Sequence, residues 1–204
     1  MICKALKKSN KGLNMKSSRI LVVDDEEEIR QSYRSILEQK NGLSEIDELG
    51  ASVFKDSEEI SLTEEEQVFF ADNTTELEVE DGLQIDSYKV VEASQGMDAV
   101  EIVKKSLAEE QPFSLMFLDI RMPPGIDGVK TAKLIRKLDP YIEIVIMTAY
   151  SDYNFEDIVK TVGNPDKLLY FHKPFKSEQI RQLASSLTQQ WYLEKKSIEQ
   201  EKTS

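Results

Sequence analysis

Short, nearly uninterrupted apolar runs that end in polar residues recur along this chain. Four of them are Ile20–Val23, Phe113–Leu118, Ile144–Met147 and Leu168–Phe171. Their lengths are typical of strands and too short for core helices. Apolar runs without polar alternation indicate strands that are buried on both faces, as in a parallel sheet covered by helices.

Segments with helical periodicity separate these runs, and the first of them, Glu26–Gln39, collects its apolar residues on one helix face. Further helices are predicted for Met97–Ala108, Gly128–Leu138, Asn154–Val162 and Lys176 to about Glu199, and strands for Arg19–Val23, Tyr88–Val91, Phe113–Asp119, Ile142–Met147 and Leu168–Phe171. This alternation predicts the α/β class, with a doubly wound parallel sheet of five strands in the order 2-1-3-4-5.

Chemically active side chains stand at the ends of four predicted strands. Asp24 and Asp25 follow the first strand, Asp119 closes the third, Thr148 follows the fourth and Lys173 follows the fifth. Open α/β sheets place their binding sites at the carboxyl ends of the strands. Three carboxylates, a hydroxyl and an ammonium are therefore expected to meet at one edge, where they can bind a divalent cation and accept a phosphoryl group.

Each of these groups also has an ordinary structural explanation. Asp24 and Asp25 can cap the helix that follows them, Thr148 can be a turn residue, and Lys173 can belong to a plain loop. The coincidence of all the polar groups at one predicted edge favours a site. His172, the only histidine, lacks the neighbours that a metal site or a catalytic triad would need.

Four motifs in this order give the chain a family resemblance. They are Val22–Glu26, Leu118–Pro123, Met147–Ala149 and Lys173–Phe175. Together they resemble the receiver domain of bacterial two-component response regulators, which has a flavodoxin-like fold. The resemblance spans about 19–193, apart from an inserted stretch.

Two longer stretches narrow the resemblance. Asp119–Gly128 and Thr148–Tyr153 look like a subgroup of receivers that are attached to histidine-kinase or cyclic-di-GMP output modules. We therefore expect the chain to belong to this subgroup.

The resemblance implies a role for each matching residue. Asp119 would accept the phosphoryl group from a phosphohistidine donor, Lys173 would pair with Asp119 and then with the phosphoryl oxygens, and Thr148 would donate a hydrogen bond to one of them. Thr148 and the strand aromatic Tyr170 would form the switch, which shifts a protein-protein interaction face between two packings.

The resemblance also implies a metal site and two modulating positions. Mg²⁺, for which Mn²⁺ can substitute, would be held by Asp25 and Asp119 directly, by Asp24 through water and by the backbone carbonyl of Arg121. The side chains of Arg121 and Tyr150 would flank the path of the hydrolytic water and modulate the lifetime of the phosphoryl group.

The negative charge of the chain is concentrated in one stretch. Between Asn41 and Ser87 there are fifteen acidic residues and one cation, a local net charge of −14 against −12 for the whole chain. We expect 43–86 to be an insertion between the first helix and the second strand. Its apolar clusters, such as Val68–Phe70, favour a partly ordered excursion over plain disorder.

The ends of the chain are expected to lie outside the core domain. Residues 1–18 form a basic leader that we expect to be disordered, and 194–204 a helical extension or linker after the receiver domain at 19–193. An apolar stripe continues beyond Gln190 to Ile198. It favours either a dimerising coiled coil or a linker to an output domain.

Composition excludes several other classes. Cys3 is the only cysteine, so no internal disulfide framework can form, which fits a reducing cytoplasm. No secretory signal follows the basic leader, and no apolar run is long enough to cross a membrane. No basic recognition helix is visible, so direct nucleic-acid contact is not expected.

The sequence therefore predicts a phosphoprotein of a two-component phosphorelay rather than a conventional enzyme, one that catalyses only its own phosphorylation and dephosphorylation. Its expected partners are a cognate histidine kinase or phosphotransfer protein, a downstream protein or fused output domain, and in one arrangement a second copy. One alternative is an adaptor that works without phosphorylation. Another is an aspartyl-nucleophile phosphatase, which would need an acid where Arg121 stands.

Overall fold

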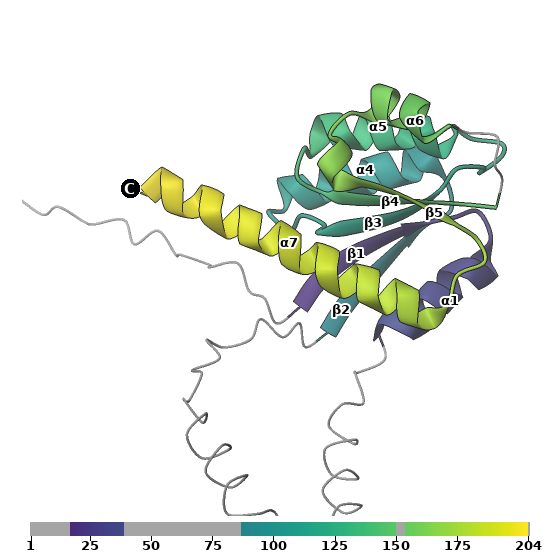
Figure 1. The fold of residues 1–204 in the computed structure, drawn as a ribbon, viewed down its shortest axis with the longest axis horizontal. Helices are drawn as coiled ribbons and strands as arrows, with labels where there is room; N and C mark the ends of the chain where they lie inside the picture. Colours follow the sequence, from purple (N-terminus) through teal and green to yellow (C-terminus); the bar gives the residue numbers. More distant parts are fainter. Residues whose placement is uncertain (1–16, 39–86, 150–153, 204) are drawn as a thin grey trace, which may run out of the picture. The chain divides into compact units, whose positions relative to one another are not determined.

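The computed structural model describes residues 17–38, 87–149 and 154–203. Their five strands form one parallel sheet in the order β2-β1-β3-β4-β5, so the predicted fold class and strand order are confirmed (Figure 1). The elements are β1 Ser17–Val23, α1 Glu27–Glu38, β2 Ser87–Ala93, α4 Gly96–Ala108, β3 Leu115–Asp119, α5 Gly128–Leu138, β4 Glu143–Thr148, α6 Phe155–Val162, the 3₁₀ helix η1 Pro165–Lys167, β5 Leu168–His172 and α7 Ser177–Thr203.

Helices cover both faces of the sheet. α4, α5 and α6 lie on one face, and α1 and α7 on the other (Figure 1). Strand side chains alternate between the two cores: Leu21 and Val23 pack toward α4 and α5, whereas Ile20 and Val22 pack toward α1 and α7. All residues of β3 and β4 are buried. This double burial is the reason that these strands are apolar without alternation.

Several element boundaries differ from the predicted ones by a few residues. β1 begins at Ser17 rather than Arg19, and β2 runs over Ser87–Ala93 because the two strands pair in parallel along seven residues each. β3 begins at Leu115, after the buried Phe113 and Ser114. α7 continues to Thr203, past the predicted end near Glu199.

Side-chain caps define the helices that begin near the carboxyl edge of the sheet. The Asp127 carboxylate accepts a hydrogen bond of 2.8 Å from the backbone N–H of Lys130 at the start of α5. Asn154 accepts one of 3.0 Å from the N–H of Glu156 at the start of α6. Each cap satisfies a donor that the first turn of a helix leaves free.

A buried ionic cluster ties α7 to the opposite, amino edge of the sheet. Glu143 is fully buried at the start of β4, and its carboxylate lies 2.9 Å from the ammonium of Lys167. The same ammonium pairs with Glu194 of α7. One residue further on, the ammonium of Lys195 lies 3.9 Å from the ring centre of Tyr141. The helix therefore contacts the domain body at residues 194 and 195.

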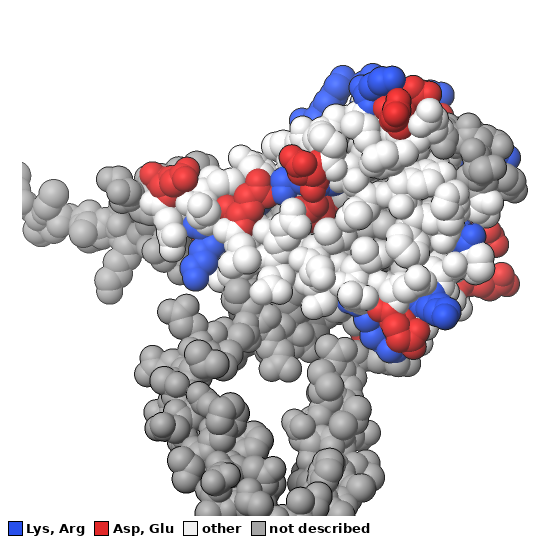
Figure 2. Space-filling model, in the orientation of Figure 1, with Lys and Arg blue, Asp and Glu red and all other residues white. Residues whose placement is uncertain are grey.

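Some predicted features lie outside the described residues. They are most of the basic leader, the acidic insertion with its apolar clusters, and Tyr150. Figure 2 shows that acidic and basic side chains of the described part are interspersed on the face drawn. Among the described helices, none combines the length and the hydrophobicity that a bilayer crossing needs.

Candidate functional site

The predicted polar groups lie at the carboxyl ends of neighbouring strands. Asp24 directly follows β1, Asp119 ends β3, Thr148 ends β4 and Lys173 directly follows β5. These four strands are adjacent in the sheet, and their registers pair Val23 with Leu118, Asp119 with Met147, and Thr148 with His172. The fold therefore assembles residues from distant parts of the sequence at one edge.

The ammonium of Lys173 joins two of the carboxylates. Its Nζ lies 2.7 Å from Oδ2 of Asp24 and 2.7 Å from Oδ1 of Asp119. The backbone N–H of Lys173 also donates a 2.8 Å hydrogen bond to the carbonyl of Thr148. Lys173 is thus fixed both by its side chain and by its backbone.

The remaining oxygens of the two carboxylates accept backbone hydrogen bonds. Oδ1 of Asp24 accepts one of 3.0 Å from the N–H of Glu26, and Oδ2 of Asp119 accepts one of 2.7 Å from the N–H of Arg121. Asp24 and Asp119 are 2 % and 8 % exposed. Such burial requires the hydrogen bonds and the ion pair, because a buried charge without partners is strongly disfavoured.

The electrostatics of Asp119 favour a basic carboxylate. Burial raises the pKa of Asp119, and the nearby charge of Asp24 raises it further, although Lys173 and the N–H of Arg121 oppose this. A carboxylate with a raised pKa is more basic and is a better nucleophile than an exposed aspartate.

Lys173 stays charged in this environment. Burial alone would lower the pKa of Lys173, but its hydrogen bonds to Asp119 and Asp24 outweigh burial and raise the pKa. The pKa of Asp119 rises mainly through burial, whereas that of Lys173 rises through its two carboxylate partners. Two carboxylates share one ammonium, so a negative charge is left over.

The donor set of this edge fits a hard divalent cation. Asp24 and Asp119 carry two negative charges against one positive charge on Lys173. The partly buried Asp25 directly follows Asp24, and oxygen ligands are those that Mg²⁺ prefers. No group of three or more histidine, cysteine, aspartate or glutamate side chains in the described part of the chain is clustered to hold a metal ion. Mg²⁺ usually keeps several waters and needs only one or two carboxylates, so the donor set suffices.

The two residues predicted to switch share one face of the sheet. Tyr170 lies on β5 beside Ile146 of β4 and packs against the core under α4, α5 and α6. Ile146 belongs to that core, and Thr148 follows it by two residues, which places Thr148 on the same face. Thr148 is buried, and Tyr170 is half-buried, with its ring centre 6.3 Å from that of Phe155 on α6.

Of the two predicted modulating residues, the structure describes Arg121 only. The exposed side chain of Arg121 follows Asp119 by two residues, and its backbone N–H contacts the Asp119 carboxylate. Tyr150 lies outside the described residues.

A pocket of about 380 Å³ opens beside Lys173. Its lining comes from the start of α1 and from the loops that follow β4 and β5, and consists of Ile29, Ser32, Ala149, Lys173, Pro174 and Phe175. An apolar surface therefore adjoins the charged groups of the site.

Two residues near the site were missed by sequence reasoning. A Cβ at Gly128 would lie 2.1 Å from the carbonyl oxygen of Asp119, so only glycine lets α5 approach the end of β3. Arg30 on α1 donates hydrogen bonds to the backbone carbonyls of Asp24 and Asp25. A glycine at a predicted helix start and a cation one turn after an acidic run were the available signals.

Comparison with known families identifies the chain. Residues 72–185, more than half of the chain, match the model of the response regulator receiver domain. The match begins at residue 72, so it does not include β1 with Asp24 and Asp25. The sheet order nevertheless places β1 between β2 and β3.

Curated relatives agree with this match. Sporulation initiation phosphotransferase F of Bacillus subtilis is 34% identical over 96 residues, which cover 47% of this chain and 70% of that protein. The transcriptional regulatory protein ZraR of Escherichia coli is 44% identical over 64 residues, 31% of this chain. The chain covers only 13% of the length of ZraR.

Solved structures show the same fold. A CheY-like response regulator receiver domain protein from Methanospirillum hungatei superposes with a TM-score of 0.54 at 18% identity, covering 87% of this chain and 98% of that one. A response regulator receiver protein from Sinorhizobium medicae gives 0.52 at 19% identity, with 87% and 99% covered. With the strand order and the family match, these likenesses lead to one conclusion: the chain belongs to the response regulator receiver domain family, the phosphoacceptor modules of two-component signalling.

Proposed function

We propose that Asp119 is the residue that accepts the phosphoryl group, with Lys173 and Thr148 as its catalytic partners. The observation that carries this proposal is the ion pair between Lys173 and Asp119 at the carboxyl edge of the sheet, with 2.7 Å between the charged atoms. Burial raises the pKa of Asp119, and the ion pair with Lys173 opposes this rise and favours the ionised carboxylate. Both features suit a carboxylate nucleophile.

The proposed reaction is a phosphoryl transfer from a phosphohistidine of a partner protein. An oxygen of Asp119 forms a bond to phosphorus while the bond from phosphorus to the imidazole nitrogen of the donor breaks, and the imidazole keeps the electron pair. Lys173 follows the charge from the carboxylate to the phosphoryl oxygens as a compact cation. Thr148 donates a hydrogen bond to one of these oxygens.

The proposed cofactor is Mg²⁺, with Mn²⁺ as a substitute. Asp25, Asp119 and the carbonyl of Arg121 would hold it directly and Asp24 through water, and when bound it supplies positive charge that offsets the phosphoryl group. The surplus of negative charge at this edge supports the assignment. The side chains of Arg121 and Tyr150 remain candidates for tuning the lifetime of the acyl phosphate.

The proposed partners follow from the same site. A histidine kinase or phosphotransfer protein would approach over the apolar pocket beside Lys173, which adjoins the acceptor. Thr148 and Tyr170 would carry the signal to α6 and β5, because Tyr170 already contacts Phe155 of α6. The output would be a downstream protein, a fused output domain or a second copy. The cytoplasmic location and the division of the chain at 18, 43–86 and 193 stay predictions.

Labelling by a small-molecule phosphodonor tests the assignment. The wild-type protein is incubated with acetyl phosphate and Mg²⁺ beside Asp119→Ala and a control, Asp157→Ala, whose carboxylate is exposed on α6. We expect label on the wild type and on the control and none on Asp119→Ala. Label of equal amount on Asp119→Ala would refute Asp119 as the acceptor.

A further inference from the structure

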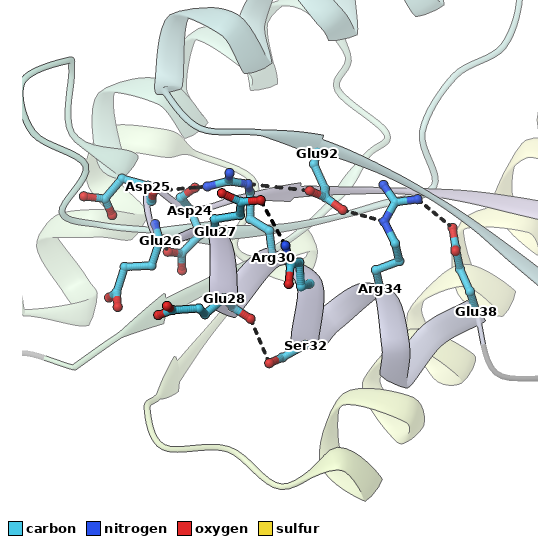
Figure 3. Close-up of polar contacts among 11 residues, drawn as sticks. Asp24, Asp25, Glu26, Glu27, Glu28, Arg30, Ser32, Arg34, Glu38 and Glu92 are labelled. Carbon is cyan, nitrogen blue, oxygen red and sulfur yellow. Dashed lines mark hydrogen bonds and ion pairs between the residues drawn. The ribbon is translucent and has the colours of Figure 1, made fainter.

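Arg30 of α1 holds the backbone of the acid loop, the residues Asp24, Asp25 and Glu26 that follow β1. One nitrogen of its guanidinium, Nη1, donates to the carbonyl oxygen of Asp24 at 2.7 Å and to that of Asp25 at 3.1 Å (Figure 3). A donor shared by two successive carbonyls fixes the direction of both peptide groups.

The guanidinium of Arg30 is itself held from the other side. Its Nε lies 3.6 Å from Oε2 of Glu92 on β2, and the other oxygen of Glu92 accepts a 2.6 Å hydrogen bond from Nε of Arg34. The Arg30 side chain is only 13% exposed. Figure 3 shows this row of alternating charges along α1, from the acid loop to Glu38.

The row ends on the backbone of the edge strand. Oε1 of Glu38 lies 3.5 Å from Nη1 of Arg34 and accepts a 3.2 Å hydrogen bond from the N–H of Val90. Both ends of the row are thus anchored to backbone groups, at β2 and at the acid loop. The position of Arg30 is therefore set by two structural elements besides its own helix.

Two further contacts orient the carboxylate of Asp24, whose backbone Arg30 holds. The Asp24 carboxylate is oriented by the N–H of Glu26, in the same loop, and by Lys173. The carboxylate of Asp25 points away from the Arg30 guanidinium in Figure 3, so Arg30 leaves it available as a ligand. A residue that orients metal ligands without contacting the metal typically contributes tenfold or more to metal affinity.

We propose that Arg30 is a positioning residue, which presents the carboxylates of Asp24 and Asp25 in the orientation that a divalent cation requires. The inference rests on the proposed Mg²⁺ site at this edge. Arginine suits the role because its planar fork can contact two carbonyls and a carboxylate together, whereas the point charge of lysine cannot.

Charge and position make opposite predictions for the same substitution. If Arg30 acted only as a nearby cation, its removal would strengthen Mg²⁺ binding, because a positive charge repels the metal. If Arg30 positions the loop, its removal weakens Mg²⁺ binding although a repulsive charge is lost. The sign of the change therefore separates the two explanations.

The experiment measures Mg²⁺ binding to the full chain by titration calorimetry, without any phosphodonor. The variants are Arg30→Met, Arg30→Gln and the matched control Arg34→Met. The control removes a cation from the same helix face, and the Arg34 side chain pairs with Glu92 and Glu38 rather than with the acid loop. We expect about tenfold weaker binding for Arg30→Met, the lower end of the range for such residues. Arg30→Gln, which keeps a donor, should recover part of the loss. Arg34→Met leaves the bonds of Arg30 to the acid loop in place and should weaken binding much less than Arg30→Met.

Amide exchange of Glu26, followed by NMR without metal, gives a second readout. The Glu26 N–H is bonded to Asp24 and should exchange faster in Arg30→Met than in Arg34→Met. Unchanged or tighter Mg²⁺ binding by Arg30→Met, with wild-type exchange at Glu26, overturns the inference. A wild-type chain that binds no Mg²⁺ overturns the proposed cofactor instead. The exchange rate of the Glu26 amide, measured without metal, then still shows whether Arg30 orders the acid loop.

Discussion

The ammonium of Lys173 lies 2.7 Å from the carboxylate of Asp119, in a contact that joins the end of β5 to the end of β3. The strand between them, β4, contributes the carbonyl of Thr148 that fixes the Lys173 backbone. Thr148 lies on the same face of the sheet as Tyr170, so Lys173 contacts both the proposed acceptor, Asp119, and one of the two residues predicted to switch.

Replacing Lys173 by methionine should slow phosphorylation of Asp119. The variant loses the only ammonium placed between Asp24 and Asp119 in the described residues, so the charge on the transferring group is no longer offset. We expect labelling by acetyl phosphate to fall about a hundredfold, as is typical when one oxyanion donor is removed. The matched control is Lys176→Met, three residues further along the chain; an equal loss of labelling in both variants would contradict the role of Lys173.

Replacing Asp119 by asparagine should stabilise the metal-free protein at neutral pH. Burial raises the pKa of Asp119 above its ordinary value of 3.8, so the native state binds this proton more tightly than the unfolded chain does. The contribution of Asp119 to stability therefore falls as pH rises from 3.8 through its native pKa.

The asparagine variant lacks this ionisation, so its advantage should grow across that pH window and then stay constant. Urea unfolding at a series of pH values, without Mg²⁺, measures the difference. Asp157→Asn, at an exposed position, is the control and should follow the wild type. A difference between Asp119→Asn and wild type that does not change with pH would show that ionisation of Asp119 is not its source.

Replacing Gly128 by alanine should disturb both stability and the acceptor. The added Cβ would lie 2.1 Å from the carbonyl oxygen of Asp119 and 2.9 Å from Cα of Ile120, and backbone atoms cannot move aside cheaply. We expect a loss of about 2 kcal/mol, in the range of overpacked sites, and slower labelling of Asp119. Gly125→Ala is the control, since its Cβ would crowd the flexible end of the Gln95 side chain and meet backbone only at an ordinary contact distance, 3.7 Å from the carbonyl oxygen of Met122. Equal stability of the two variants in urea unfolding would contradict the close approach at Gly128.

Replacing Lys167 by methionine should destabilise the fold where α7 contacts the amino edge of the sheet. Glu143 is fully buried and would lose its ammonium partner, which is expected to lower the free energy of unfolding by about 3 kcal/mol. The exposed pair of Lys104 with Glu101 offers the matched control, and Lys104→Met should change stability by less than about 0.5 kcal/mol. Similar midpoints for the two variants in urea unfolding would mean that the buried cluster does not anchor the helix.

Local sequence patterns predicted most of the fold because the central strands β3 and β4 are buried on both faces. The runs at Leu115–Asp119 and Glu143–Thr148 have no exposed side, so their hydrophobicity alone marks them as parallel strands. Gly128 and Asn154 stand at helix starts where caps and turns are common, and α5 and α6 begin there within one residue. The site edge followed from the strand ends, because parallel strands bring their carboxyl ends together.

Contacts between elements were not predictable in the same way. The proposed role of Arg30 depends on Glu92 of β2, which lies beside it, although the stretch predicted to be an insertion stands between the two residues in sequence. The cluster of Glu143, Lys167 and Glu194 likewise joins residues of three separate elements. No local periodicity specifies such pairs, and they become visible only when the sheet has set the neighbours of each helix.

Chemical trapping of the phosphorylated residue tests the central assignment most directly. The wild-type chain is phosphorylated with acetyl phosphate and Mg²⁺, reduced with borohydride, which converts an aspartyl phosphate to homoserine, and mapped by peptide mass spectrometry. The account predicts homoserine at position 119 and unchanged aspartate at 24 and 25. Homoserine at either of those two positions, with aspartate intact at 119, would contradict it.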